Sequence, residues 1–114
     1  MKSGIREVSF KRLRNNYPKG ICGIYDNGGK SADRYTVVFN PFLDTNDHKV
    51  YWYYLAMSAN PFHPQGVGIT DCTVNKRPGS GSKGWGNACG KTINWDDLPA
   101  DCKKAAMNLL VEED

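Results

Sequence analysis

The sequence predicts an α+β fold, in which a small curved antiparallel sheet of four to five strands carries a C-terminal helix on one face. Three observations favour this class: β-branched and aromatic runs in the middle of the chain, turn-forming residues between them, and an amphipathic C-terminal segment. With 114 residues the chain can bury one modest hydrophobic core, so we expect a single domain over residues 1–114.

The strongest strand signals are RYTVVF at residues 34–39 and VYWYYLAM at residues 50–57. Alternation assigns the side chains of the second run to two faces, one with Tyr51, Tyr53, Leu55 and Met57 and the other with Val50, Trp52, Tyr54 and Ala56. Since both faces carry aromatic rings, this strand is either central and covered on both sides or has one face free for a flat ligand or a partner chain. Weaker strands are predicted at residues 21–25 and 91–95, and residues 40–49 are predicted to form a polar loop.

The C-terminal helix is predicted over residues 97–112. Asp97 is suited to cap its N-terminus, Pro99 suits the first turn, where a missing N–H costs nothing, and Asp101 complements the helix dipole. Apolar side chains recur at helical spacing and predict the buried stripe, which comprises Leu98, Cys102, Ala105, Ala106, Leu109 and Leu110.

The composition is that of an ordinary globular protein, with 39% hydrophobic and 24% charged residues. No apolar run is long enough to span a bilayer, and the N-terminal residues lack the apolar core of a signal peptide, so we expect a cytoplasmic protein that does not enter a membrane. Charge is unevenly distributed: residues 1–20 hold six basic side chains and one acidic one, whereas residues 96–114 hold six acidic and two basic ones. The basic segment is either a solvated face or an arm that meets an anion.

Four cysteines, Cys22, Cys72, Cys89 and Cys102, allow a disulfide framework, but we expect reduced thiols in a cytoplasmic protein. No C-x-x-C pair occurs, and a zinc site would need three of these thiols together with His63 at irregular spacings. The sequence therefore predicts no metal site.

A glycine-rich loop is predicted at residues 76–90. Residues 79–84 (GSGSKG) satisfy the dinucleotide pattern G-x-G-x-x-G, and residues 90–92 (GKT) resemble the end of a phosphate-binding loop. Neither run leads directly into a predicted helix, which both motifs require, so no cofactor is expected. The loop can still close over a ligand, with Lys83 or Trp85 as contacts.

The side chains best suited to ligand recognition are Arg34 and Tyr35, at the head of a predicted strand, and Asn60 and Gln65, in the turn NPFHPQGVG. Guanidinium and amide groups give planar recognition through several donors, a tyrosine ring can stack on a base, and Lys91 can neutralise a phosphate.

Pairing of residues 34–39 with residues 50–57 would bring Arg34 close to the turn at residues 60–68. The alternative is structural, with Arg34 paired to Asp33 or to a terminal carboxylate and the amides of the turn capping backbone groups.

His63 lies in the same turn, between two prolines. General acid–base catalysis commonly needs a histidine held by a second group, and His63 has no serine or aspartate at a telling spacing. We therefore predict no catalytic residue and expect His63 to stabilise the turn or to contact a ligand.

Three runs together, RYTVVF, MSANPFHPQGVG and GKTINWDDLPADC, resemble a family of small phage and prophage proteins. They cover residues 34–39, 57–68 and 90–102, about a third of the chain. This sequence departs from the family pattern at residues 69–72 (ITDC), where relatives have polar, often histidine-containing residues. The resemblance implies expression in the cytoplasm of an infected bacterium and a role in countering host defence.

The leading expectation is a non-enzymatic protein that sequesters a phosphorylated, nucleotide-like signalling molecule. A homo-oligomer with its pocket at the interface would suit this role. In that role Arg34, Asn60, His63 and Gln65 would recognise the ligand, with Tyr35 or Trp85 stacking on it. One alternative is a protein-binding inhibitor of a host defence effector or nuclease, with the aromatic strand or the charged termini as its interface. Another is a nucleic-acid-binding module that uses the basic N-terminal segment.

Overall fold

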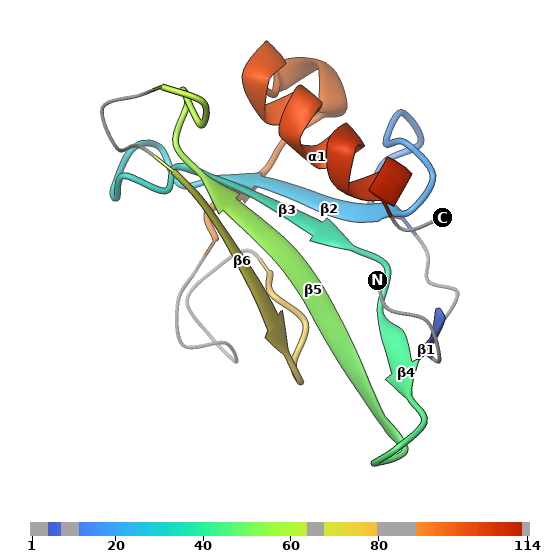
Figure 1. Cartoon of the computed structure of the whole chain (residues 1–114). Coiled ribbons are helices and arrows are strands. Elements are labelled where there is room, and N and C mark those ends of the chain that lie inside the picture. The colour runs from blue at the N-terminus through green and yellow to red at the C-terminus, as the bar shows by residue number, and fades with distance from the viewer. Residues whose placement is uncertain (1–4, 8–11, 64–67, 80–88, 113–114) are drawn as a thin grey trace.

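The computed structural model describes residues 5–7, 12–63, 68–79 and 89–112. Its elements in chain order are β1 (Ile5–Glu7), β2 (Ile21–Asp26), β3 (Tyr35–Phe39), β4 (Phe42–Asp44), β5 (Lys49–Met57), β6 (Ile69–Val74), β7 (Lys91–Thr92), the 3-10 helix η1 (Trp95–Asp97) and the helix α1 (Ala100–Glu112). Figure 1 shows α1 lying across one face of the sheet, so the predicted α+β class is confirmed.

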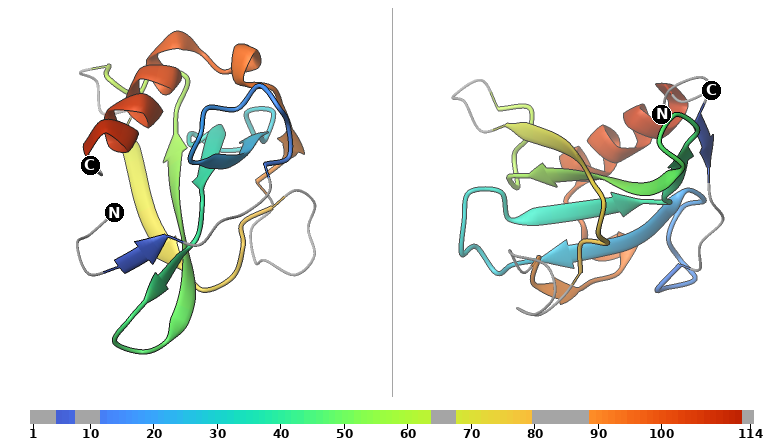
Figure 2. Two further views of the ribbon diagram at one scale, coloured as in Figure 1. Left: turned by 90° about the vertical axis from the view of Figure 1, so that its right-hand side faces the viewer. Right: turned by 90° about the horizontal axis from the view of Figure 1, so that it is seen from below.

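The sheet is open, and all its pairings are antiparallel. β3 and β4 follow one another along one side of β5, while β6 pairs with its other side. β2 joins β3, β7 joins β2, and β1 joins β4. The predicted pairing of residues 34–39 with residues 50–57 is confirmed by a register that runs from Tyr35 opposite Met57 to Val38 opposite Tyr54. Figure 2 shows that β4 and the adjoining end of β5 extend beyond the part of the sheet that α1 covers.

Several boundaries differ from the prediction. Residues 40–49 are not entirely loop, because Phe42–Asp44 form β4 and the Phe42 ring lies 6.1 Å from the Tyr51 ring of β5. The last strand ends at Thr92 rather than at residue 95, since Trp95–Asp97 form η1. β6 was not predicted from the sequence.

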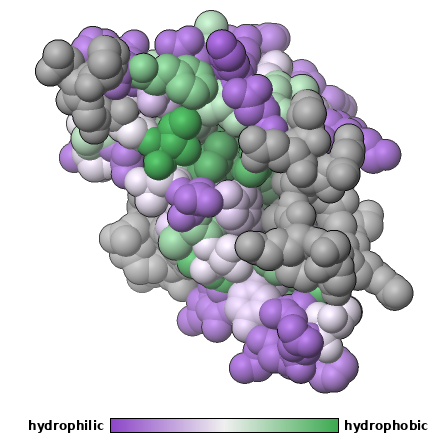
Figure 3. Space-filling model, viewed as in Figure 1, coloured by the Kyte–Doolittle hydropathy of each residue, from purple (hydrophilic) through white to green (hydrophobic). Residues whose placement is uncertain are grey.

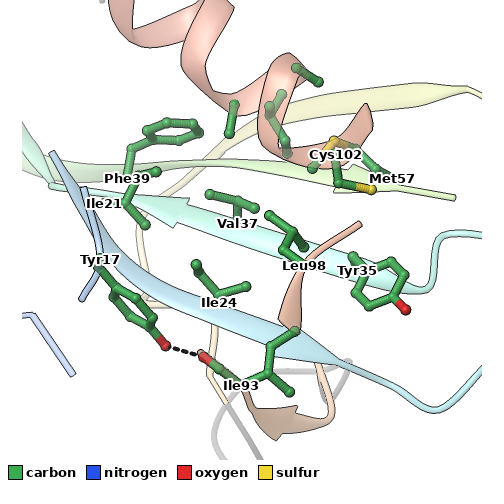
Figure 4. Packing of buried hydrophobic residues seen from close by; sticks show 13 residues of the cluster. Tyr17, Ile21, Ile24, Tyr35, Val37, Phe39, Met57, Ile93, Leu98 and Cys102 are labelled. Atoms are coloured by element: carbon green, nitrogen blue, oxygen red, sulfur yellow. Dashed lines mark hydrogen bonds between the residues drawn. The ribbon is translucent and has the colours of Figure 1, made fainter. Parts of the chain in front are cut away.

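The central strand β5 sends its side chains to two cores, as its alternation predicts. Tyr53, Leu55 and Met57 belong to the core beneath α1, whereas Trp52 and Tyr54 pack on the opposite face with Cys22, Tyr25, Val38 and Cys89. The core beneath α1 is the larger of the two (Figure 4).

Tyr17 closes one side of the larger core. Its buried hydroxyl donates a hydrogen bond of 2.7 Å to the carbonyl oxygen of Ile93, as Figure 4 shows. The segment before β2 is thereby joined to the segment after β7, 76 residues further along the chain.

Helix α1 begins at Ala100, and Asp97 is not its N-cap. The Asp97 carboxylate instead accepts the Asn94 N–H at 3.1 Å and closes the turn of η1. Pro99 lies just before the helix, where its carbonyl accepts the Lys103 N–H at 3.0 Å. The predicted buried stripe is confirmed: four of its side chains are buried and two are half-buried, namely Leu98, Cys102, Ala105 and Ala106, with Leu109 and Leu110 packed beside them. Within the described ranges, no helix is long and apolar enough to cross a membrane.

Candidate functional site

Part of the predicted ligand site gathers at one end of the sheet, around Asp26. Asp26 ends β2 and lies opposite both Tyr35 of β3 and Lys91 of β7. Arg34 donates two hydrogen bonds to its carboxylate, one of 2.8 Å from Nε to Oδ1 and one of 3.1 Å from Nη2 to Oδ2. The register of three strands therefore brings together Asp26, Arg34, Tyr35 and Lys91, which we call the sheet-end cluster.

The charge balance of the sheet-end cluster is less positive than the sequence suggests. The hydrogen bonds from Arg34 are the largest cause of the lowered pKa of Asp26, and the Gly28 N–H and the charge of Lys91 lower it further, against the opposing effect of burial. The Arg34 guanidinium also lies over the Tyr35 ring, 5.1 Å from its centroid, and the ring is buried in the core beneath α1. Asp26 thus neutralises Arg34, and Tyr35 does not offer an open stacking surface.

Among the described residues, the partner of Arg34 is Asp26 and not Asp33, while the carboxylates of residues 113–114 lie outside them. The carboxylate lies eight residues before Arg34, across the β2–β3 hairpin. The ion pair agrees with the structural role that was the alternative prediction for Arg34, but the partner is Asp26.

The turn after β5 carries the other described residues of the predicted site. Asn60 and His63 are exposed, and their backbone N–H groups bond to the Ser58 hydroxyl at 3.3 Å and to the Asn60 carbonyl at 3.1 Å. Cys102 of α1 holds the start of the turn through a 3.2 Å contact from its sulfur to the Ser58 carbonyl. Pairing of Tyr35 with Met57 places Arg34 at the level of Ser58, so the predicted proximity of Arg34 to this turn agrees with the register. Gln65, Lys83 and Trp85 lie outside the described residues.

The structure also contains a groove that the sequence analysis missed. It lies between α1 and the strands β5 and β6 and has a volume of about 210 Å³. Its lining residues are Tyr53, Leu55, Phe62, Ile69, Asp71, Ala105, Asn108 and Leu109. We call it the α1–β6 groove. Figure 3 shows hydrophobic surface in this region, bordered by hydrophilic side chains.

The α1–β6 groove follows from three local patterns. β5 directs Tyr53 and Leu55 toward the helix side, β6 is in register with them, and the small side chain of Ala105 on α1 leaves space above the sheet. Two large apolar side chains remain exposed at the groove, Phe62 to 46% and Ile69 to 39%.

Polar groups in the α1–β6 groove are few, and two of them are joined by a hydrogen bond. The Tyr53 hydroxyl donates a 2.7 Å hydrogen bond to Asp71 Oδ2, which orients the carboxylate. The Lys104 ammonium lies 5.7 Å from the centroid of the Phe62 ring. An apolar lining with a few oriented polar groups is typical of a binding site.

The four cysteines are free thiols and lie in different places. Cys22 and Cys89 belong to the core opposite α1, whereas Cys102 belongs to the core beneath it, and Cys72 is half-buried on β6. Burial is the main cause of the raised pKa of Cys22 and of Cys102, each about 11, and it also raises the pKa of Cys89. The described residues include no group of three or more His, Cys, Asp or Glu side chains placed to hold a metal ion.

The basic N-terminal segment is described at Ile5–Glu7, which form β1, and again from Arg12 onward. Arg12, Arg14 and Lys19 are exposed. Arg12 donates a 2.7 Å hydrogen bond to the Tyr17 carbonyl, which ties this segment to the fold. Nucleic-acid binding by the segment stays a prediction.

Comparison of the chain with protein-family models, with curated proteins and with solved structures finds no match. Its function is therefore inferred from its own residues.

Phe62, Ile69 and Asp71 are the candidate functional residues that the sequence analysis missed. A signal was present, because ITDCTV is rich in β-branched residues, which are typical of strands. That signal predicts a strand, but it does not predict the position of the strand at an edge of the sheet next to α1.

Proposed function

We propose that this chain is a non-enzymatic binding protein that holds a partner protein at the α1–β6 groove. The observation that carries the proposal is the exposure of Phe62 and Ile69 at a hollow whose walls come from α1, β5 and β6. Contiguous exposed apolar surface beside a groove, with a polar rim, is typical of protein–protein interaction sites.

The chemistry of the groove lining supports binding. Of its eight residues five are aliphatic or aromatic hydrocarbons, and the others supply a phenol, a carboxylate and an amide. Such a set suits apolar side chains of a partner and one or two of its hydrogen-bond donors. In keeping with the resemblance to phage proteins, the partner is a host defence effector or nuclease that this protein inhibits.

The test is capture of the partner from a lysate of the bacterium that expresses the protein, followed by calorimetry with the purified partner. Ile69→Lys places a charge at the groove, and Val50→Lys makes the same change at an exposed strand position outside it; the two side chains are 39% and 40% exposed. We expect the wild type and Val50→Lys to hold the partner and Ile69→Lys to release it. Equal retention by both variants would exclude the groove as the interface.

A second candidate function is the capture of a phosphorylated, nucleotide-like molecule at the sheet-end cluster. The convergence of Arg34 and Lys91 on this end, with Asn60 and His63 exposed in the adjoining turn, supports it. Since Asp26 already neutralises Arg34, the exposed Lys91 would supply the charge for phosphate. We expect a rise in melting temperature with cyclic or ADP-ribose-type nucleotides that Lys91→Ala abolishes and Lys30→Ala, an exposed lysine in the β2–β3 turn, does not.

A further inference from the structure

Strand β6 has one free edge. It pairs with β5 along residues 69–74 without a register shift, and no other strand in the described part of the chain pairs with it (Figure 1). An edge strand presents N–H and C=O groups to which another extended chain can add. Proteins commonly block such edges with lysine, proline or a bulge, and residues 69–74 contain none of these.

The alternation of hydrogen-bonded pairs between β5 and β6 shows which backbone groups of β6 face outward. Just before β6, the Ser58 N–H donates to the Gly68 carbonyl at 3.5 Å, so residues 58 and 68 form a hydrogen-bonded pair. Hydrogen-bonded and non-hydrogen-bonded pairs alternate along an antiparallel ladder. The N–H and C=O groups of Ile69, Asp71 and Thr73 therefore point away from β5, toward the free edge.

The side chains of the same three residues lie on the helix side of the sheet. Ile69, Asp71 and Thr73 are opposite Met57, Leu55 and Tyr53, which all belong to the core beneath α1 or pack against it. Side chains opposite one another across a strand pair share a face. In an added strand, the residues that hydrogen-bond to Ile69 and Asp71 thus direct their own side chains to the α1–β6 groove.

We propose that the partner docks as an extended strand on the free edge of β6, with an apolar side chain opposite Ile69 and a basic one opposite Asp71. This inference rests on the proposed function and specifies its mode. The exposed Ile69 and the nearby Phe62 select the apolar side chain. The Asp71 carboxylate selects the basic one, because the hydrogen-bond partner it has among the described residues is the neutral Tyr53 hydroxyl.

The same carboxylate argues against a second copy of this chain as the occupant. Asp71 is the middle one of the three outward-facing residues. Antiparallel pairing of two β6 strands about a two-fold axis centred there would set two Asp71 carboxylates directly opposite, and like charges in that position are destabilising.

The test uses the full chain labelled with ¹⁵N and a synthetic peptide. Every second residue of the peptide is threonine, and the residues between the threonines are alternately valine and lysine. Valine and lysine then share one face and threonine occupies the other. We expect addition of the peptide to shift the amide signals of Ile69, Asp71 and Thr73 and to slow their hydrogen exchange. Thr70 and Cys72, whose amides face β5, should change little.

Two matched peptides test the strand pairing itself. N-methylation of the valine and lysine amides removes the donors that face β6, and we expect it to abolish binding. N-methylation of the threonine amides alters the outer edge alone and should leave binding intact. Replacement of lysine by glutamate should weaken binding about tenfold, and Asp71→Lys should restore binding of the glutamate peptide.

Three results would overturn the strand-docking proposal. They are an absence of shifts at millimolar peptide, equal binding of the two N-methylated peptides, and concentration-dependent shifts of the same three amides without peptide, which would identify a second copy as the occupant. If the partner protein is nonetheless lost in Ile69→Lys and retained in Val50→Lys, the groove remains its interface and the docking mode alone is refuted.

Discussion

Gly90 offers a sharp test of the close approach between β7 and β2 that builds the sheet-end cluster. Its φ is +100°, and a Cβ atom there would overlap the Asp26 carbonyl oxygen and come within 2.5 Å of Asn27 Cα. These are backbone atoms of the neighbouring chain segment, so no side chain can rotate away to make room. Gly90→Ala must therefore separate β7 from the end of β2.

The expected loss of stability has two parts. A left-handed backbone costs a residue with a Cβ roughly 1–2 kcal/mol. Relief of the overlap adds about 1–3 kcal/mol, typical of overpacking, because it strains the pairing of Asp26 with Lys91 and of Tyr25 with Thr92. We therefore expect Gly90→Ala to lower the free energy of unfolding by about 3 kcal/mol.

Gly29→Ala is the matched control. Gly29 has a φ of +89°, and nothing lies within 4 Å of the position of its Cβ, so only the backbone cost applies. We expect a loss of roughly 1–2 kcal/mol for this variant. Urea unfolding at neutral pH, followed by tryptophan fluorescence, compares the two variants with the wild type. Equal losses would show that β7 does not approach Asp26 as closely as described.

Three further predictions concern the core, the ion pair and the thiols. Tyr17→Phe leaves the buried Ile93 carbonyl without its donor and should cost about 1–3 kcal/mol in urea unfolding; an unchanged midpoint would contradict the hydrogen bond. The pKa of Asp26 lies below its ordinary value of 3.8 in the folded protein, mainly because of Arg34, so this pair stabilises the fold at neutral pH and the contribution is lost as pH falls below about 4. Stability measured from pH 7 to pH 3 should accordingly fall more steeply for the wild type than for Arg34→Met, and parallel curves would refute the assignment. Iodoacetamide at neutral pH should modify Cys72 first, as mass spectrometry of peptides would show, because burial raises the pKa of the other three thiols; earlier modification of any of those three would contradict their burial.

Much of the fold could be predicted because its signals are local. Alternation within VYWYYLAM distinguishes Leu55, which faces α1, from Trp52, which faces the other core. The helical spacing of Cys102, Ala105 and Ala106 likewise identifies the buried stripe of α1. The N-cap was misassigned because Asp97 has a competing local partner, the Asn94 N–H.

The candidate sites were less predictable because each depends on residues from separate strands. Arg34 was predicted as a ligand-binding residue, yet the sequence of the chain does not show that Asp26, across a hairpin, neutralises it. Phe62 lies in the run MSANPFHPQGVG and Asp71 in the run ITDC, yet neither was predicted as a site residue, since the local sequence does not show which side chains share a groove. They matter because they line the groove left by α1 over β5 and β6.

By itself, the sequence determined the class of the fold, the pairing of its two strongest strands and the face to which most of their side chains point. These properties depend on the periodicity of neighbouring residues and on the short connection between the strands. The tertiary structure alone decided which charges meet and where apolar surface stays uncovered. The register of β2, β3 and β7 set the partner of Arg34, and the position of α1 left Ile69 exposed at a free strand edge. Both outcomes depend on contacts between separate strands or between the helix and the sheet, which the pattern within one segment does not encode.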